Sequence, residues 1–213
     1  MSKYEEINNS DLDYLKKHFN LHKVDFFKDV ILKEKIGNAY FFLFPFFDSD
    51  NNIVGKTYFN INYKKKEVGK TSSKWSKVFA KNELYDYLFL SDNPLSLIKY
   101  YSRLSTKYKN KNLLFLVPYK YDYGTIVAIK KEYDFKRIIT LFDNKATSDL
   151  FRIITNSGIA EKKIKIEIID GEYNIKYKNH TLTLDKLDYH KVFEKYRLYS
   201  GIDHKKNKEY EKN

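Results

Sequence analysis

The sequence predicts an α/β protein with a parallel sheet at its core, and the middle of the chain supplies the main observations. Short apolar runs occupy Leu84–Leu90, Leu113–Val117 and Arg137–Phe142. Segments with helical periodicity follow these runs, and proline or polar residues end them. Near-continuous apolar strands that alternate with helices are typical of a parallel sheet covered on both faces. We therefore expect an α/β core over residues 81–160, between an N-terminal segment (1–80) and a C-terminal one (161–213).

The N-terminal segment is predicted to be β-rich after one short helix. Asn8–Ser10 can cap a helix over Asp11–Phe19. Asp25–Lys35 fits either a helix or a strand. Asn38–Phe47 is predicted to be a strand because it is rich in aromatic residues, and a polar turn leads from it into a return strand over Lys56–Asn62.

Three helices are predicted in the core. Pro94 suits the first turn of a helix, where the missing N–H is no loss, and apolar residues at helical spacing follow it. Thr125–Tyr133 is predicted to form a second, short helix. Lys145–Asn156 is amphipathic and is predicted to form the third, with Gly158 at the position just past its end.

The C-terminal segment changes to a strand pattern. Lys163–Ile169 alternates apolar and polar residues, Asp170-Gly171 is a hairpin signal, and Tyr173–Tyr177 fits the second strand. Asp185–Tyr199 is predicted to be a closing helix. The charged tail from Ile202 onward is expected to fray.

Composition favours an anionic partner. The 213 residues include 40 Lys and Arg against 28 Asp and Glu, which gives a formal charge of +12 and a pI near 9.4. Lys, Asn, Ile, Tyr and Phe are abundant together, so a coding bias also contributes to the lysine excess. The absence of cysteine excludes disulfides and Cys-ligated metal sites. No apolar run long enough to cross a membrane and no signal-peptide pattern occur, so we expect a cytoplasmic protein without a membrane partner.

Two basic segments are candidates for binding nucleic acid. Lys56–Lys77 contains seven lysines and one acid, Glu67, with aromatic residues between them. Lysines can track phosphates while aromatic rings stack on bases, although a solvated loop with core aromatics fits the same pattern. In the second segment, cations recur every four residues on one helical face. The candidates are Lys64, Lys65, Lys66, Lys70, Lys74 and Trp75 in the first segment, and Lys99, Arg103 and Lys107 in the second.

Two aspartates, Asp92 and Asp143, follow directly on predicted core strands. Polar residues just beyond the carboxyl ends of parallel strands are where such sheets bind ligands. An aspartate at this position also commonly caps the next helix, and both residues precede a predicted helix. The sequence alone leaves these two roles open.

The same residues resemble a known domain. The first motif is Asp92-Asn-Pro-Leu-Ser-Leu97, and the second is Phe142-Asp-Asn-Lys-Ala146, with Asp143 lying 51 residues after Asp92. Together they resemble a degenerate Toprim domain of the primase-like proteins carried by bacterial mobile elements. In that family an acidic residue, usually Glu, precedes a small-Pro pair after the first strand, and Asp-x-Asp-x-Ala-Gly follows the third. Here Asp92 replaces Glu, Lys145 replaces the second Asp, and Thr147-Ser148 replaces Ala-Gly.

The resemblance implies phosphoryl transfer assisted by Mg²⁺. It makes Asp92 an acid/base or metal-near carboxylate and Asp143 a metal ligand. Because Lys145 carries +1 where the family has an aspartate with −1, the charge beside the ion changes by two units. This change weakens metal binding unless Asp149 compensates. Lys145 can instead contact phosphate directly.

We therefore favour a nucleic-acid-binding, Toprim-like protein of a mobile element or phage, with a degenerate metal site, no catalysis and no cofactor. One alternative is an Mg²⁺-dependent enzyme of primase or nuclease type. Another is a structural or protein-interaction component of a phage or plasmid system. The sequence does not distinguish DNA from RNA and does not give the oligomeric state.

Overall fold

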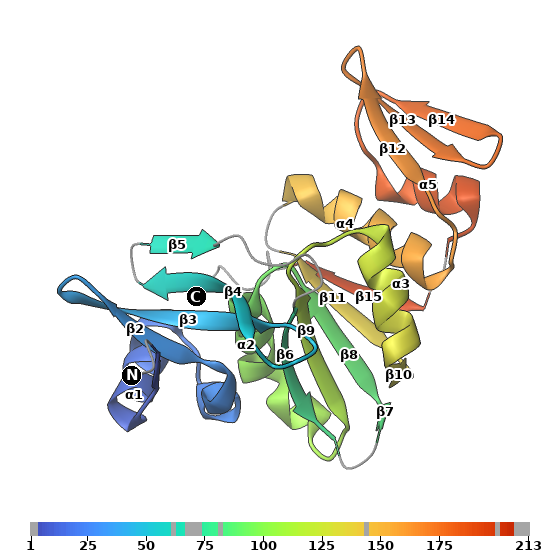
Figure 1. Ribbon diagram of the computed structural model, residues 1–213. Helices are drawn as coiled ribbons and strands as arrows, with labels where there is room; N and C mark the ends of the chain where they lie inside the picture. The colour runs from blue at the N-terminus through green and yellow to red at the C-terminus, as the bar shows by residue number, and fades with distance from the viewer. Residues whose placement is uncertain are drawn as a thin grey trace.

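The N-terminal part of the chain forms a helix and a set of antiparallel strands (Figure 1). The computed structural model describes residues 4–60, 63–66, 74–80, 83–142, 145–198 and 201–206. The elements of this part are β1 (Glu5–Glu6), α1 (Asn9–Phe19), the 3₁₀ helix η1 (Val24–Val30), β2 (Leu32–Ile36), β3 (Ala39–Phe47), β4 (Ile53–Asn60), β5 (Tyr63–Lys66) and β6 (Lys74–Phe79). The ambiguous segment Asp25–Lys35 thus divides between η1 and β2.

The core alternates strands with helices, as expected. Its elements are β7 (Leu84–Tyr85), β8 (Tyr87–Ser91), α2 (Pro94–Leu104), the 3₁₀ helix η2 (Ser105–Tyr108), β9 (Leu113–Pro118), α3 (Tyr123–Glu132), β10 (Asp134–Phe135), β11 (Ile138–Phe142) and α4 (Lys145–Ile159). Strands β9, β8 and β11 are neighbours and run parallel in one sheet. The prediction that the three apolar runs lie parallel is confirmed, and so is the α/β class.

The last elements are β12 (Lys165–Ile169), β13 (Glu172–Tyr177), β14 (His180–Leu184), α5 (Tyr189–Tyr196) and β15 (Ile202–Lys206). Over the described residues, one ten-stranded sheet has the order β1-β2-β3-β6-β9-β8-β11-β15, and β4 and β5 extend it from β3. Strand β6 is antiparallel to β9 and therefore joins the N-terminal strands to the parallel core. One sheet thus runs through both predicted regions.

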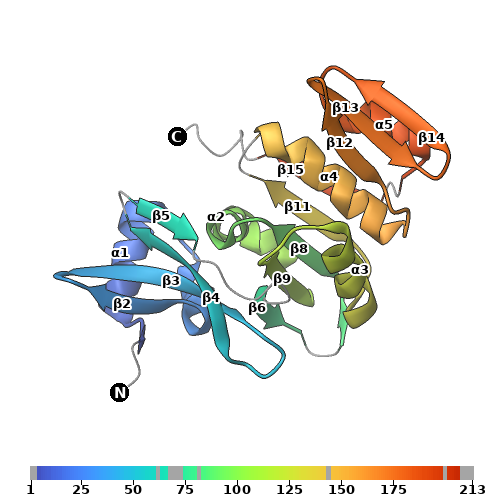
Figure 2. The same cartoon turned by 45° about the horizontal axis from the view of Figure 1, so that its top comes forward.

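Helices cover both faces of the parallel strands (Figures 1 and 2). On one face, η1 and α2 pack on Phe115, and α2 also packs on Phe89. On the other face, α3 and the end of α4 pack on Leu88 and Leu114. Successive residues from Leu88 to Leu90 and from Leu113 to Val117 therefore point into opposite cores and are fully buried. This explains why Leu88–Leu90 and Leu113–Val117 are apolar at every position.

The end of α4 differs from the prediction, because Gly158 lies inside the helix and not past its end. A Cβ at this position would lie 2.6 Å from both Cβ and Cγ2 of Ile126 on α3. Glycine is required here because it lets α3 and α4 approach closely. Its role is packing, which the sequence pattern does not distinguish from helix termination.

The C-terminal segment forms a small unit beside α4 (Figure 2). Strands β12, β13 and β14 form an antiparallel sheet, so β14 adds a third strand to the predicted hairpin. Ile153 of α4 packs into this unit's core. The predicted helix Asp185–Tyr199 is shorter than expected, because Asp188 caps its start and Arg197 ends it in the left-handed conformation, with φ 48°.

The prediction of a frayed tail is wrong for residues Ile202–Lys206. They form β15, which pairs in parallel with β11 along its length, from Ile138 to Phe142. Ile202 is buried against the core that contains α3. The free edge of β11 supplies the hydrogen-bonding partner that the local sequence does not reveal. None of the helices in the described parts of the chain is long and apolar enough to cross a membrane.

Candidate functional site

The carboxyl ends of β8 and β11 lie side by side at one edge of the sheet. The register pairs Ser91 with Leu141, so Asp92 follows β8 beside the end of β11. Helix α2 leaves β8 toward the face that η1 covers, whereas α4 leaves β11 toward the face of α3. In open α/β sheets, ligands bind where neighbouring strands send their helices to opposite faces. We call this edge the switch point, and Asp92 lies at it.

Asn93, rather than Asp92, caps α2. Its side chain accepts a hydrogen bond from the Leu95 N–H at 3.2 Å and donates one to Ser96 Oγ at 3.1 Å. Ser91 Oγ accepts from the Asn93 N–H at 3.1 Å and donates to the Leu141 carbonyl at 2.5 Å. The capping role considered for Asp92 is therefore wrong. The hydroxyl of Ser91 instead ties the start of α2 to the end of β11.

Tyr121, which follows β9, is a neighbour of Asp92 that the sequence analysis did not select. Its hydroxyl lies 2.5 Å from Thr155 Oγ1, and Thr155 donates in turn to the Phe151 carbonyl at 2.7 Å. Burial raises the pKa of the Tyr121 phenol; the hydrogen bond with Thr155 lowers it, and the negative charge of Asp92 raises it further. The phenol thus stays protonated and links the loop after β9 to α4.

Two further rings complete an apolar wall at the switch point. The ring centroids of Phe142 and Phe151 lie 5.4 and 4.7 Å from that of Tyr121. Phe142 ends β11 and Phe151 belongs to α4. The three rings thus pack together where the loop after β9, the end of β11 and α4 meet.

Of the three carboxylates predicted for a metal site, the structure describes Asp92 and Asp149. The Asp149 carboxylate lies 3.7 Å from the guanidinium of Arg152, and charges on both residues act on the Tyr189 phenol of α5. Asp149 thus belongs to the contact between α4 and α5. Within the ranges that the structure describes, no three His, Asp or Glu side chains are grouped to hold a metal ion. Asp143 lies outside these ranges, and Lys145 begins α4.

Trp75 is a core residue, so the prediction that it stacks on a nucleic-acid base is wrong. Its side chain is fully buried, and Nε1 donates to the Val30 carbonyl at 2.9 Å. The rings of Phe27 and Phe44 pack against it at centroid distances of 6.2 and 5.7 Å. Side chains of β6 alternate between its two sides, and Trp75 points inward. The lysines beside it in the sequence are the reason that this strand was not predicted.

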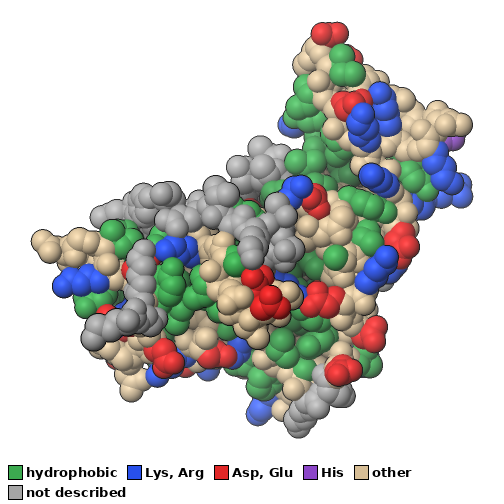
Figure 3. Space-filling model, viewed as in Figure 1, with side chains coloured by type: hydrophobic (Ala, Val, Ile, Leu, Met, Phe, Trp, Pro, Cys, Tyr) green, Lys and Arg blue, Asp and Glu red, His purple; other side chains and the backbone are tan. Residues whose placement is uncertain are grey.

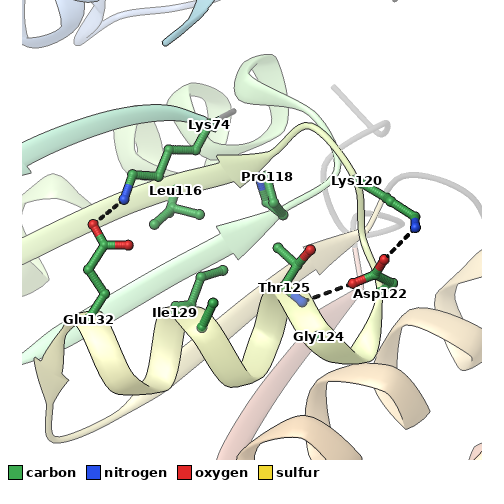
Figure 4. Close-up of a pocket in the computed structure, with 10 residues that line it drawn as sticks. Lys74, Leu116, Pro118, Lys120, Asp122, Gly124, Thr125, Ile129 and Glu132 are labelled. Atoms are coloured by element: carbon green, nitrogen blue, oxygen red, sulfur yellow. Dashed lines mark hydrogen bonds and ion pairs between the residues drawn. The ribbon is translucent and has the colours of Figure 1, made fainter. Parts of the chain in front are cut away.

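Lys74, also on β6, pairs with an acid on α3. Its ammonium pairs with Glu132 and donates to the Tyr133 hydroxyl across a cavity of about 370 Å³ between β6, β9 and α3 (Figure 4). At the other end of this cavity, Asp122 accepts from the Thr125 N–H and pairs with Lys120 at 2.8 Å. The residues that line the cavity thus satisfy one another's charges.

The remaining basic candidates differ in position. Lys99 and Arg103 on α2 and Lys107 on η2 are all exposed, as their shared spacing predicts. Lys64–Lys66 lie on β5, which pairs with β4. Lys70 lies outside the described residues. On the face of the molecule in Figure 3, Lys and Arg side chains are scattered among Asp and Glu, so the +12 charge forms no uniform basic field there.

Comparisons with known proteins give distant likenesses only. No protein-family model and no curated protein matches the sequence. The fold is similar to the primase fragment of the bacteriophage T7 primase-helicase protein, with a TM-score of 0.44 and 12% identity over 61% of this chain and 53% of that one. It is also similar to a structure of bacteriophage T7 lagging-strand DNA polymerase interacting with primase domains bound to an RNA/DNA hybrid and dTTP, with a TM-score of 0.41 and 14% identity over 56% and 54% of the two chains.

The chain spans about half the length of each of these two chains. Likenesses at this distance carry no functional argument. The function proposed below therefore depends on the residues and topology of this chain.

Proposed function

We propose that this protein binds nucleic acid through its Toprim-like core and that its metal site is degenerate and without catalysis. The proposal includes an origin in a mobile element or phage, which the resemblance of the switch-point motifs implies. The observation that carries the proposal is the place of Asp92 at the switch point, directly before a helix that has only basic charges. No acidic residue occurs between Asp92 and Asp122.

The charges of α2 and η2 favour a polyanion. Their charged residues are Lys99, Arg103 and Lys107, all of them exposed. We call these three residues the α2 basic face. A single-sign surface gains affinity for nucleic acid by neutralising phosphates and releasing counterions. Other lysines of the chain serve a different purpose, since Lys74 pairs with Glu132 and Lys77 pairs with Asp29.

The loss of catalysis follows from two side chains. Lys145 stands where the resemblance predicts a second metal-binding aspartate, and an ammonium repels a cation bound at that place. Asp149, which would have to compensate, pairs with Arg152. One observation favours the enzymatic alternative. Asn93 is the residue that caps α2, so capping does not account for an aspartate at position 92. Metal-dependent activity is therefore part of the test.

Salt-dependent binding tests the proposal. Affinity for fluorescent single-stranded DNA and RNA is measured across a salt series, with and without Mg²⁺, for the parent and for a variant with Lys99→Ala, Arg103→Ala and Lys107→Ala. Log affinity should fall linearly with log salt, and the variant should lower the magnitude of this slope by about 2, at about 0.7 per lost phosphate contact. Product formation with Mg²⁺ would support the enzymatic alternative instead.

The matched control removes the same charge from the C-terminal unit. Lys163, Lys186 and Lys191 are exposed there, and their joint replacement by Ala should leave the slope unchanged. An equal effect of the control would show that net charge, and not the α2 basic face, drives binding. A parent protein that ignores both nucleic acids at low salt would refute the proposed function.

A further inference from the structure

A groove of about 700 Å³ lies at the opposite end of the parallel strands from the switch point. It is bordered by η1, by η2 and the turn that follows it, and by the end of β6. Phe79, at that end, pairs with Leu113, the first residue of β9. Helix α2 starts beside Asp92 at one edge of the sheet, so its far end and η2 reach the groove. A volume of this size suits a small ligand or one unit of a larger one.

Aromatic rings form one wall of the groove. The Phe26 ring lies 5.1 Å from that of Phe79 and 4.7 Å from that of Tyr101. Phe79 is 49% exposed, although it is a large apolar side chain at the end of a strand. An exposed ring supported by two others behind it offers a flat surface on which a nucleobase can stack.

The rim of the groove is basic. His22, Lys23, Lys109 and Lys111 border it, and the only acid among its described lining residues is Asp25. That carboxylate already accepts a hydrogen bond from Lys16 at 2.9 Å, which lowers the pKa of Asp25. The acid is therefore balanced from outside the groove, and the lysines leave an excess of positive charge beside the aromatic wall.

An aromatic wall beside lysines matches a base with its phosphate. The lysines come from two elements, Lys23 before η1 and Lys109 and Lys111 after η2, so they are suited to separate phosphates along a chain. No glycine occurs among the described lining residues to form the backbone cradle typical of free nucleoside triphosphate sites. These features favour a strand over a free nucleotide.

We propose that the groove binds one nucleotide of a single-stranded nucleic acid, with the base on Phe79 and the phosphates at Lys109 and Lys111. The inference takes its ligand class from the proposed function but concerns a different site. Stacking contributes to the binding free energy in a way that does not depend on salt, whereas the contribution of the two lysines weakens as salt rises.

Two neighbouring residues of β6 allow a matched test. Val78 and Phe79 are both 49% exposed, but they point to opposite sides of the strand and only Phe79 borders the groove. Phe79→Ala should weaken binding of a short fluorescent oligothymidylate about 5- to 150-fold without changing the salt slope. Val78→Ala should leave the affinity unchanged. A thermal melt of each variant establishes that equal folded fractions are compared.

The charge of the rim is tested separately. Lys109→Ala with Lys111→Ala should lower the magnitude of the salt slope by about 1.4 for the same oligonucleotide. Thymidine monophosphate serves as the free-nucleotide probe and should compete only weakly. Competition as strong as that of the oligonucleotide, and lost in Phe79→Ala, would overturn the assignment to a strand.

The outcomes separate this inference from the proposed function. If the parent binds the oligonucleotide and Phe79→Ala binds it equally well, the groove inference is refuted and the proposed function stands. If the parent binds no nucleic acid at low salt, both are refuted.

Discussion

Replacing Gly158 by Ala should destabilise the protein, although it removes glycine from a helix. Alanine is favoured over glycine in a helix interior by about 1 kcal/mol. At Gly158, however, the new Cβ would lie 2.6 Å from Cβ and Cγ2 of Ile126 and 3.5 Å from the Tyr123 carbonyl oxygen. Carbon atoms in contact prefer about 3.5–4.0 Å, so α3 and α4 must separate by about 1 Å.

The size of the effect follows from this contact. The Cβ of Ile126 is fixed to the α3 backbone, so no change of rotamer relieves the overlap, and the cost is at the upper end of the usual 1–3 kcal/mol for overpacking, about 3 kcal/mol. Subtracting the gain in helix propensity leaves a loss of about 2 kcal/mol in the free energy of unfolding. For a chain of this size, the melting temperature should fall by about 4–8 °C.

Urea denaturation followed by circular dichroism, together with a thermal melt, measures this loss. Gly124→Ala is the control, because Gly124 also lies in a helix and its added Cβ would meet only Asp122 Oδ1 at 3.6 Å. The control should keep or slightly raise the stability, by up to about 1 kcal/mol. A Gly158→Ala variant as stable as the parent would show that α3 and α4 can shift freely, and the rigid packing inferred here would be refuted.

Three other variants or conditions test the core, the pH response and the metal site. Trp75→Ala should lower the free energy of unfolding by about 3–5 kcal/mol, as for other buried aromatic residues, and leave the nucleic-acid affinity of the folded fraction unchanged; a loss of affinity without a loss of stability would contradict its core position. Burial, with the hydrogen bond to Glu34, raises the pKa of Tyr58 to about 12 from 10.0. The stability present below pH 10 should therefore fall by about 2–3 kcal/mol as the pH rises to 12, and this fall should be smaller in Tyr58→Phe; equal slopes in a pH series of urea melts would contradict the assignment. Because Lys145 replaces a metal-binding aspartate, titration calorimetry should detect little or no binding of Mg²⁺ at millimolar concentration, and neither primer synthesis nor nicking should occur; metal-dependent product that Asp143→Ala abolishes would show that the site is catalytic.

The parallel core could be predicted from sequence because both of its faces are buried. Strands β8, β9 and β11 are apolar at successive positions, and this pattern needs no knowledge of neighbouring elements. Strands β6 and β15 could not be found in this way. In Lys74–Phe79 lysines surround the inward-pointing Trp75, and Ile202–Lys206 has a single apolar residue. Their strand conformation depends on the edges of β9 and β11, to which they hydrogen-bond.

The switch point was predicted only in part, for a similar reason. The place of Asp92 follows from the end of an apolar run, but the capping role considered for it belongs to the next residue, Asn93. Pro94 contained the necessary signal, because proline favours the first helical position and therefore marks Asn93 as the cap. Tyr121 carried no such signal. Its link to Thr155 joins residues 34 positions apart and exists only once β9 and α4 are packed on the same sheet.

The lysines of the chain have two different roles, pairing with acids of the chain and forming exposed basic surfaces, and only the fold shows which lysine has which role. Lys33 pairs with Asp11 at 2.9 Å and Lys77 with Asp29 at 2.6 Å, so these charges stabilise contacts between elements and contribute little to an external field. The α2 basic face and Lys109 and Lys111 of the groove rim, in contrast, lie along the continuous segment formed by α2, η2 and the turn after them. At about 1.5 Å per residue in α2 and about 2 Å in η2, this segment extends roughly 25 Å from the switch point to the groove. A single strand that reached both ends would bind them as linked sites, and its affinity would exceed that of a strand too short to span them.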